Sequence, residues 1–166
     1  MLIIKDAMIL IHLAKLSLLE ISCDYFEEVM IPKLVSNEVL NGIKNKYPDA
    51  KIIEGLIEEK KIIVKEVKEK FLIKKANQFN IQKGEAEVVA LYWQEEAKLI
   101  ATDDDNVRKK KILLNLNLIG TPAIILLLYQ NKKIDNLKLK QSLTELKKIG
   151  WFNNSIFDKI TMEAQL

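Results

Sequence analysis

Short apolar runs alternate along the chain with longer segments in which apolar residues recur at helical spacing. The short runs are rich in aliphatic and β-branched residues, and they predict buried strands at 2–4, 29–31, 61–64, 98–101 and 116–119. The longer segments predict helices. These helices are expected at 7–19, 33–46, 48–59, 71–79, 84–96, 105–115, from 121 onward, 136–148 and 155–163.

The alternation of strands and helices predicts the fold class. Strands separated by helices form mostly parallel sheets, and such sheets are covered by helices on both faces. The chain has 166 residues, with five glycines and three prolines. That length suits one domain with a sizeable core, and the composition does not favour long linkers. We therefore expect a single α/β domain over residues 1–166.

Acidic residues gather where the predicted strands end. In an open α/β sheet, ligands bind at the carboxyl ends of the strands. Asp6 directly follows the first strand, and the run 103–105 directly follows the fourth. Acids also lie on the helices around them. The full set is Asp6, Glu38, Glu85, Glu87, Asp103, Asp104 and Asp105.

Carboxylates brought together repel one another unless they are protonated or bridged by a cation. Mg²⁺ or Mn²⁺ suits such oxygen ligands, and these ions can activate water and neutralise a phosphate under attack. Glu85 and Glu87 are two positions apart on a helix, so their side chains diverge. Any one acid alone is more simply explained as a helix cap. The joint pattern over four elements favours a metal site.

The net charge and the single cysteine and histidine bear on which classes of function and site are possible. The net charge of +3 is weakly basic. Lysine-rich segments at 60–75 and 132–148 are either solvated helix faces or surfaces that follow a phosphate backbone. Cys23 is the only cysteine and His12 the only histidine, which excludes an internal disulfide and a Cys/His zinc site. No apolar run is long enough to span a membrane, so we expect a cytoplasmic protein without membrane contact.

Four segments of the chain form a recognisable series: Asp6 after its strand, Pro-Lys-Leu-Val-Ser-Asn-Glu-Val around Glu38, Gly-Glu-Ala-Glu-Val-Val-Ala-Leu at 84–91, and Leu-Ile-Ala-Thr-Asp-Asp at 99–104. In the order and spacing of these segments, residues 2–133 resemble the PIN-domain family, near the relatives of VapC-type toxins that are described as predicted nucleic-acid-binding proteins. The resemblance implies a three-layer α/β/α fold with a central parallel five-stranded sheet. Residues 134–166 would then form a C-terminal helical extension.

The same resemblance implies an activity and a set of site residues. It implies a Mg²⁺- or Mn²⁺-dependent endoribonuclease, the toxin of a toxin–antitoxin pair, with an RNA substrate, an antitoxin protein as partner and a homodimeric state. The catalytic residues would be Asp6, Glu38, Glu87 and Asp104. The metal ligands would be Asp6, Glu87, Asp103 and Asp104. Thr102 and Glu85 would have supporting roles.

One departure from the family pattern leaves alternatives open. Met8 stands where the family usually has serine or threonine. A hydroxyl there would fix the first aspartate or a metal-bound water. Its absence favours a second hypothesis, a non-catalytic RNA-binding protein, unless Thr102 or solvent replaces it. A receiver-like phosphoacceptor domain is a third, but it lacks an acidic pair after the first strand. Trp151 is interpreted either as a base-stacking residue or as a residue that packs the tail onto the body.

Overall fold

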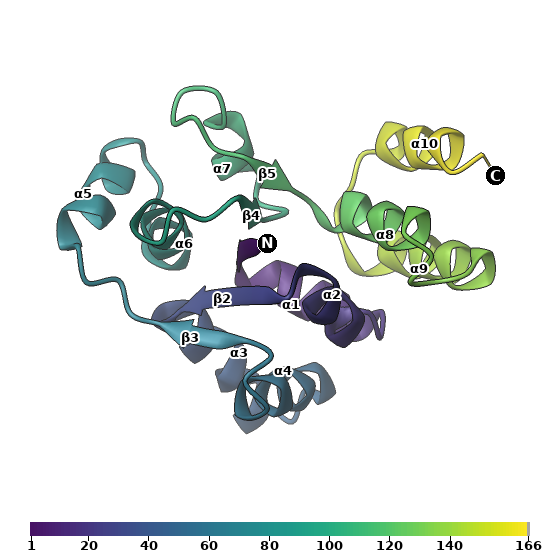
Figure 1. The fold of residues 1–166 in the computed structure, drawn as a ribbon, viewed down its shortest axis with the longest axis horizontal. Helices are drawn as coiled ribbons and strands as arrows, with labels where there is room; N and C mark the ends of the chain where they lie inside the picture. The colour runs from purple at the N-terminus through teal and green to yellow at the C-terminus, as the bar shows by residue number, and fades with distance from the viewer. Residues whose placement is uncertain (166) are drawn as a thin grey trace.

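The computed structural model describes residues 1–165, in which strands and helices alternate from the N-terminus to β5 (Figure 1). Within these residues the strands are β1 (Leu2–Lys5), β2 (Glu28–Pro32), β3 (Ile63–Lys65), β4 (Leu99–Ala101) and β5 (Leu118–Ile119). The helices are α1 (Ala7–Lys15), α2 (Leu19–Phe26), α3 (Lys33–Lys44), α4 (Pro48–Glu58), α5 (Lys70–Gln78), α6 (Lys83–Gln94), α7 (Asp105–Lys109), α8 (Thr121–Gln130), α9 (Asn136–Ile149) and α10 (Asn154–Glu163). No helix among residues 1–165 has both the length and the apolar character needed to cross a lipid bilayer.

The five strands of the described chain form one parallel sheet in the order β3-β2-β1-β4-β5. The central pair is β1 and β4, with Ile4 opposite Ile100 and Lys5 opposite Ala101. The Asp6 N–H extends this pairing by donating to the Ala101 carbonyl at 3.1 Å. The chain segments that follow β1 and β4 therefore leave the sheet side by side, which brings Asp6 close to the acids after β4.

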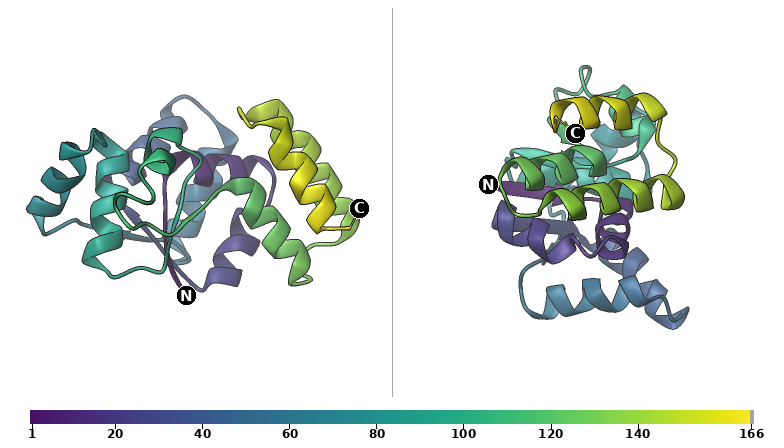
Figure 2. Two further views of the ribbon diagram at one scale, coloured as in Figure 1. Left: turned by 90° about the horizontal axis from the view of Figure 1, so that it is seen from above. Right: turned by 90° about the vertical axis from the view of Figure 1, so that its right-hand side faces the viewer.

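Helices cover both faces of this sheet, as the sequence predicts. Helix α6 contacts β1, β2 and β4, whereas α2 contacts β2. The strand side chains Ile3, Ile4 and Ile100 are fully buried between these layers. Helices α8, α9 and α10 lie together at one end of the molecule, opposite α5 (Figure 2). The predicted three-layer α/β/α fold is confirmed.

Two predicted helices are wrong in extent. The helix expected at 7–19 ends at Lys15, because Ser17 has a positive φ of 57°, and α2, which the sequence pattern does not predict, begins at Leu19. The helix expected at 105–115 ends at Lys109. Ile112 and Leu113 beyond that point are exposed and only Leu114 is buried, so little apolar burial stabilises a longer helix there.

Candidate functional site

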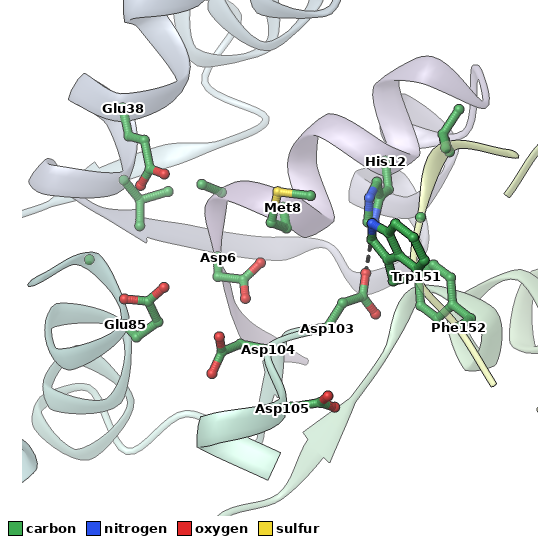
Figure 3. Close-up of a pocket in the computed structure, with 15 residues that line it drawn as sticks. Asp6, Met8, His12, Glu38, Glu85, Asp103, Asp104, Asp105, Trp151 and Phe152 are labelled. Carbon is green, nitrogen blue, oxygen red and sulfur yellow. Dashed lines mark hydrogen bonds and ion pairs between the residues drawn. The ribbon is translucent and has the colours of Figure 1, made fainter. Parts of the chain in front are cut away.

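The acids at the strand ends line one pocket of about 390 Å³ (Figure 3). Its walls come from the starts of α1 and α7, from α3 and α6, and from the loop between α9 and α10. The acidic lining residues are Asp6, Glu38, Glu85, Asp103, Asp104 and Asp105. No lysine or arginine of residues 1–165 lines the pocket, and the one histidine that lines it, His12, is paired with Asp103.

Asp6 is buried at the centre of this group, although it is an acid. Its Oδ1 accepts from the Ile9 N–H at 2.9 Å and caps α1, and its Oδ2 accepts from the Thr102 hydroxyl. Burial raises the pKa of Asp6 to about 7, and the charges of Asp103 and Asp104 act in the same direction. The two hydrogen bonds oppose this increase in pKa without cancelling it.

The Thr102 hydroxyl links the acids that follow β1 and β4. It donates to Asp6, and its oxygen accepts from the Asp104 N–H at 3.0 Å. Asp104 in turn caps α7, because its Oδ1 accepts from the Val107 N–H at 2.8 Å. Thr102 therefore orients the side chain of Asp6 and the backbone of Asp104 at once. Met8 lines the same pocket and is half exposed, so it does not take this role.

Glu38 and Glu85 form the facing wall, from α3 and α6 (Figure 3). Partial burial raises the pKa of Glu38, and the charge of nearby Glu85 raises it further. The Glu38 Oε2 lies 3.4 Å from the place where a Cβ on Gly84 would stand. The absence of a side chain at Gly84 thus gives the Glu38 carboxylate room beside the first turn of α6.

Glu87 does not line the pocket, although the family resemblance places it among the metal ligands. Its Oε2 accepts from the Leu34 N–H at 3.1 Å, which pairs one of the free N–H groups at the start of α3. Glu85 instead faces the pocket. The family resemblance favours Glu87 over Glu85 as a site residue, whereas in the structure Glu85 and not Glu87 lines the pocket. Sequence spacing shows that the two diverge, but not which one faces inward.

Asp103 also lines the pocket, but its oxygens are committed to protein partners. Its Oδ1 accepts from the Thr121 N–H at 2.8 Å. Its Oδ2 accepts from the Thr121 hydroxyl at 2.5 Å and lies within hydrogen-bond distance, 2.9 Å, of the His12 Nδ1. Asp103 thus has three polar partners that join α1 to the start of α8, whereas each Asp6 oxygen accepts one hydrogen bond, so Asp103 suits its expected role as a metal ligand less well than Asp6 does. The link to His12 spans 91 residues and has no local sequence signal.

Replacing Asp103 by alanine should destabilise the fold. The change leaves the fully buried Thr121 and the buried His12 without their shared acceptor. Unpaired buried donors cost about 1–3 kcal/mol each, so we expect a loss of roughly 3 kcal/mol in urea unfolding. Asp105→Ala is the matched control, because that exposed acid should cost less than about 1 kcal/mol. Equal losses for the two variants would contradict the structural role of Asp103.

The carboxylates of the pocket suit a hard cation that keeps several of its waters better than a cation coordinated by protein ligands alone. Among residues 1–165, no three Asp, Glu, His or Cys side chains are close enough to coordinate one ion directly. Mg²⁺ is usually held by one or two carboxylates and keeps several waters. Asp6 and Asp104, which border the pocket from adjacent strand ends, can supply those carboxylates. The burial of Asp6 among other acids is the feature that a cation would compensate.

Comparisons with known proteins identify the family. No curated protein and no solved structure matches the chain significantly. A family profile described as a PIN domain matches residues 2–165, which is nearly the whole sequence. This match agrees with the parallel five-stranded sheet and with the acids at its carboxyl end. The chain therefore belongs to the PIN-domain family, whose members are generally nucleases and typically use divalent metals.

Proposed function

We propose that this protein is a Mg²⁺- or Mn²⁺-dependent endoribonuclease. One observation supports this most: the pocket at the carboxyl ends of β1 and β4 gathers six acids, and no lysine or arginine of the described residues lines it. A cation bound there would offset the repulsion among the acids and attract an RNA phosphate. Membership of a family of nucleases supports the same activity.

The reaction is hydrolysis of a phosphodiester, in which water adds to phosphorus and an alcohol leaves. Asp6 and Asp104 would hold a divalent cation, which would supply charge neutralisation at the phosphate. The Thr102 hydroxyl keeps Asp6 in place. Glu38 accepts the proton of the attacking water, a role suited to a carboxylate whose pKa is raised.

Glu85 and Glu87 provide a matched test of this site, because they lie on one helix and differ in direction. We expect Glu85→Gln to lower the rate of RNA cleavage with Mn²⁺ by roughly 10- to 100-fold, since the charge of Glu85 raises the pKa of the proposed base Glu38. Glu87→Gln should change the rate less than about twofold, because the amide oxygen still accepts from the Leu34 N–H. The measurement is the cleavage rate of a labelled single-stranded RNA, with EDTA as the metal-free control.

Wild-type cleavage that EDTA does not stop would contradict the metal mechanism. A larger loss for Glu87→Gln than for Glu85→Gln would contradict the assignment of the inward-facing acid. Purified Glu85→Gln should unfold at the temperature of the wild type within a few degrees, which separates a catalytic loss from a folding defect.

A second candidate is an RNA-binding protein that does not cleave, which the half-exposed Met8 in the pocket favours. The hydrogen bond from Thr102 to Asp6 weighs against it, because this bond supplies the orientation that a hydroxyl at position 8 would give. Salt-sensitive RNA binding without cleavage in any divalent metal would favour the second candidate. Cleavage that appears only in Met8→Ser would indicate an enzyme that has lost its activity.

We further propose that the protein is the toxin of a toxin–antitoxin pair and forms a homodimer. The support is its likeness to VapC-type toxins in the order and spacing of the acids. Light scattering that gives only monomer at high protein concentration would exclude the homodimer. Expression that does not slow growth of the host, despite RNA cleavage by the purified protein, would count against the toxin role.

A further inference from the structure

Trp151 has an unusual position beside the acid pocket. It lies in the short loop between α9 and α10, and its side chain is fully exposed. The same side chain lines the pocket together with Gly150 and Phe152 (Figure 3). The sequence allows Trp151 to pack the tail onto the body, but its full exposure shows that it does not.

Phe152 anchors the loop instead. Its ring centroid lies 5.8 Å from that of His12 and 6.1 Å from that of Phe157. A Cβ on Gly150 would stand 2.3 Å from Phe152 Cε2, so a side chain at position 150 would collide with this ring. The loop thus rests on His12, which itself contacts the site residue Asp103. The packing of Phe152 against His12 and Phe157 therefore places Trp151 at the pocket edge, although Trp151 itself makes none of these contacts.

The negative charge of the pocket limits the contacts that it can make with a nucleic-acid strand. Its acids repel phosphates, and no lysine or arginine of the described chain lines it to compensate. A bound cation attracts one phosphate, but neighbouring nucleotides need an uncharged contact. A flat exposed indole supplies one, because every nucleobase has a face that stacks on an aromatic ring. A base inside a duplex has no free face for this contact.

We propose that Trp151 is the stacking surface for one unpaired nucleobase next to the phosphate in the acid pocket. This inference rests on the proposed ribonuclease function, and it names the substrate class as single-stranded RNA at the cleavage site. Gly150 and Phe152 act as positioning residues, since they place the loop. The indole adds affinity that does not depend on charge.

The test compares Trp151→Ala, Trp151→Phe and the control Leu137→Ala, which alters an exposed apolar residue of α9 outside the pocket. The probe is a short fluorescent single-stranded RNA, bound in Ca²⁺ and cleaved in Mn²⁺. We expect Trp151→Ala to weaken binding roughly 5- to 150-fold, by a similar factor at low and high salt. Trp151→Phe should keep most of the affinity and Leu137→Ala all of it. An abasic nucleotide at the stacked position should reduce the affinity of the wild type but not that of Trp151→Ala.

Other outcomes separate this inference from the proposed function. If the wild type cleaves RNA and Trp151→Ala has the same affinity and the same KM, the stacking role is overturned and the nuclease stands. If the wild type does not cleave, but RNA quenches the Trp151 fluorescence in a Trp93→Phe background, stacking is supported and the nuclease fails. If Trp151→Ala leaves RNA affinity unchanged and dissociates a dimer, a second copy covers Trp151 and the inference is overturned.

Discussion

Asp6→Asn and Asp104→Asn are each expected to lower RNA cleavage in Mn²⁺ by roughly 100- to 1000-fold, because stabilisation by a bound cation supplies several kcal/mol to the transition state. Both acids border the pocket from the ends of β1 and β4, and Thr102 ties their positions together. An amide is a weaker, uncharged ligand. We therefore expect the loss to appear in metal binding as well as in the rate.

Calorimetric titration of Mn²⁺ measures the binding, and a cleavage assay on the same samples measures the rate. Asp105→Asn is the matched control, since Asp105 lines the same pocket but is exposed and lies at the start of α7. It should change the rate less than about threefold, because an exposed acid at a helix start contributes little. Full activity in both Asp6→Asn and Asp104→Asn would show that the acids serve only as helix caps.

The same Asp6→Asn change is expected to stabilise the metal-free protein at alkaline pH. The pKa of Asp6 is raised from 3.8 to about 7 in the fold, mainly by burial. The stability that the protonated carboxyl contributes is fully present below pH 3.8 and is lost as the pH rises to about 7. Above that pH the ionised Asp6 costs roughly 4 kcal/mol relative to its protonated form.

Asparagine keeps the shape of the side chain and its cap on Ile9 without the charge. Because it disturbs the hydrogen bond with Thr102, we expect a net gain of roughly 2–3 kcal/mol at pH 8, or about 4–12 °C in melting temperature. Near pH 4 the gain should turn into a loss of roughly 1–2 kcal/mol, because Asp6 is then protonated in the fold and only the disturbed hydrogen bond with Thr102 remains. Thermal melts of both proteins in EDTA across this range provide the measurement. Mn²⁺ should stabilise the wild type at pH 8 but not the variant. The argument would be refuted if, without metal, the wild type became more stable relative to the variant between pH 4 and pH 8.

Loss of activity and gain of stability in one variant would have a common physical cause. The buried charge of Asp6 opposes folding in the absence of metal, and the same charge holds the cation. A protein in which Asp6 served only to cap α1 would lose stability on this substitution or keep it unchanged.

The fold and the place of the site are predictable from the sequence, because both depend on local patterns. Short β-branched runs between amphipathic segments predict a parallel sheet, and acids two residues after Ile4 and Ala101 must emerge at its carboxyl end. The ends of α1 and α7 are less predictable. Ser17 adopts a positive φ, and only Leu114 is buried among residues 110–115, which are both consequences of packing rather than of pattern.

The roles of individual acids were decided only by tertiary contacts. Glu85 faces the pocket and Glu87 caps α3, because α3 packs against the first turns of α6 from a segment about fifty residues away. Asp103 is committed to Thr121 and His12, so it differs from its neighbour Asp104 in chemistry although the two are adjacent in sequence. Local sequence determines which residue types stand at a strand end. Which carboxylate faces the pocket depends on which donors the rest of the fold brings to it, and those donors come from distant segments.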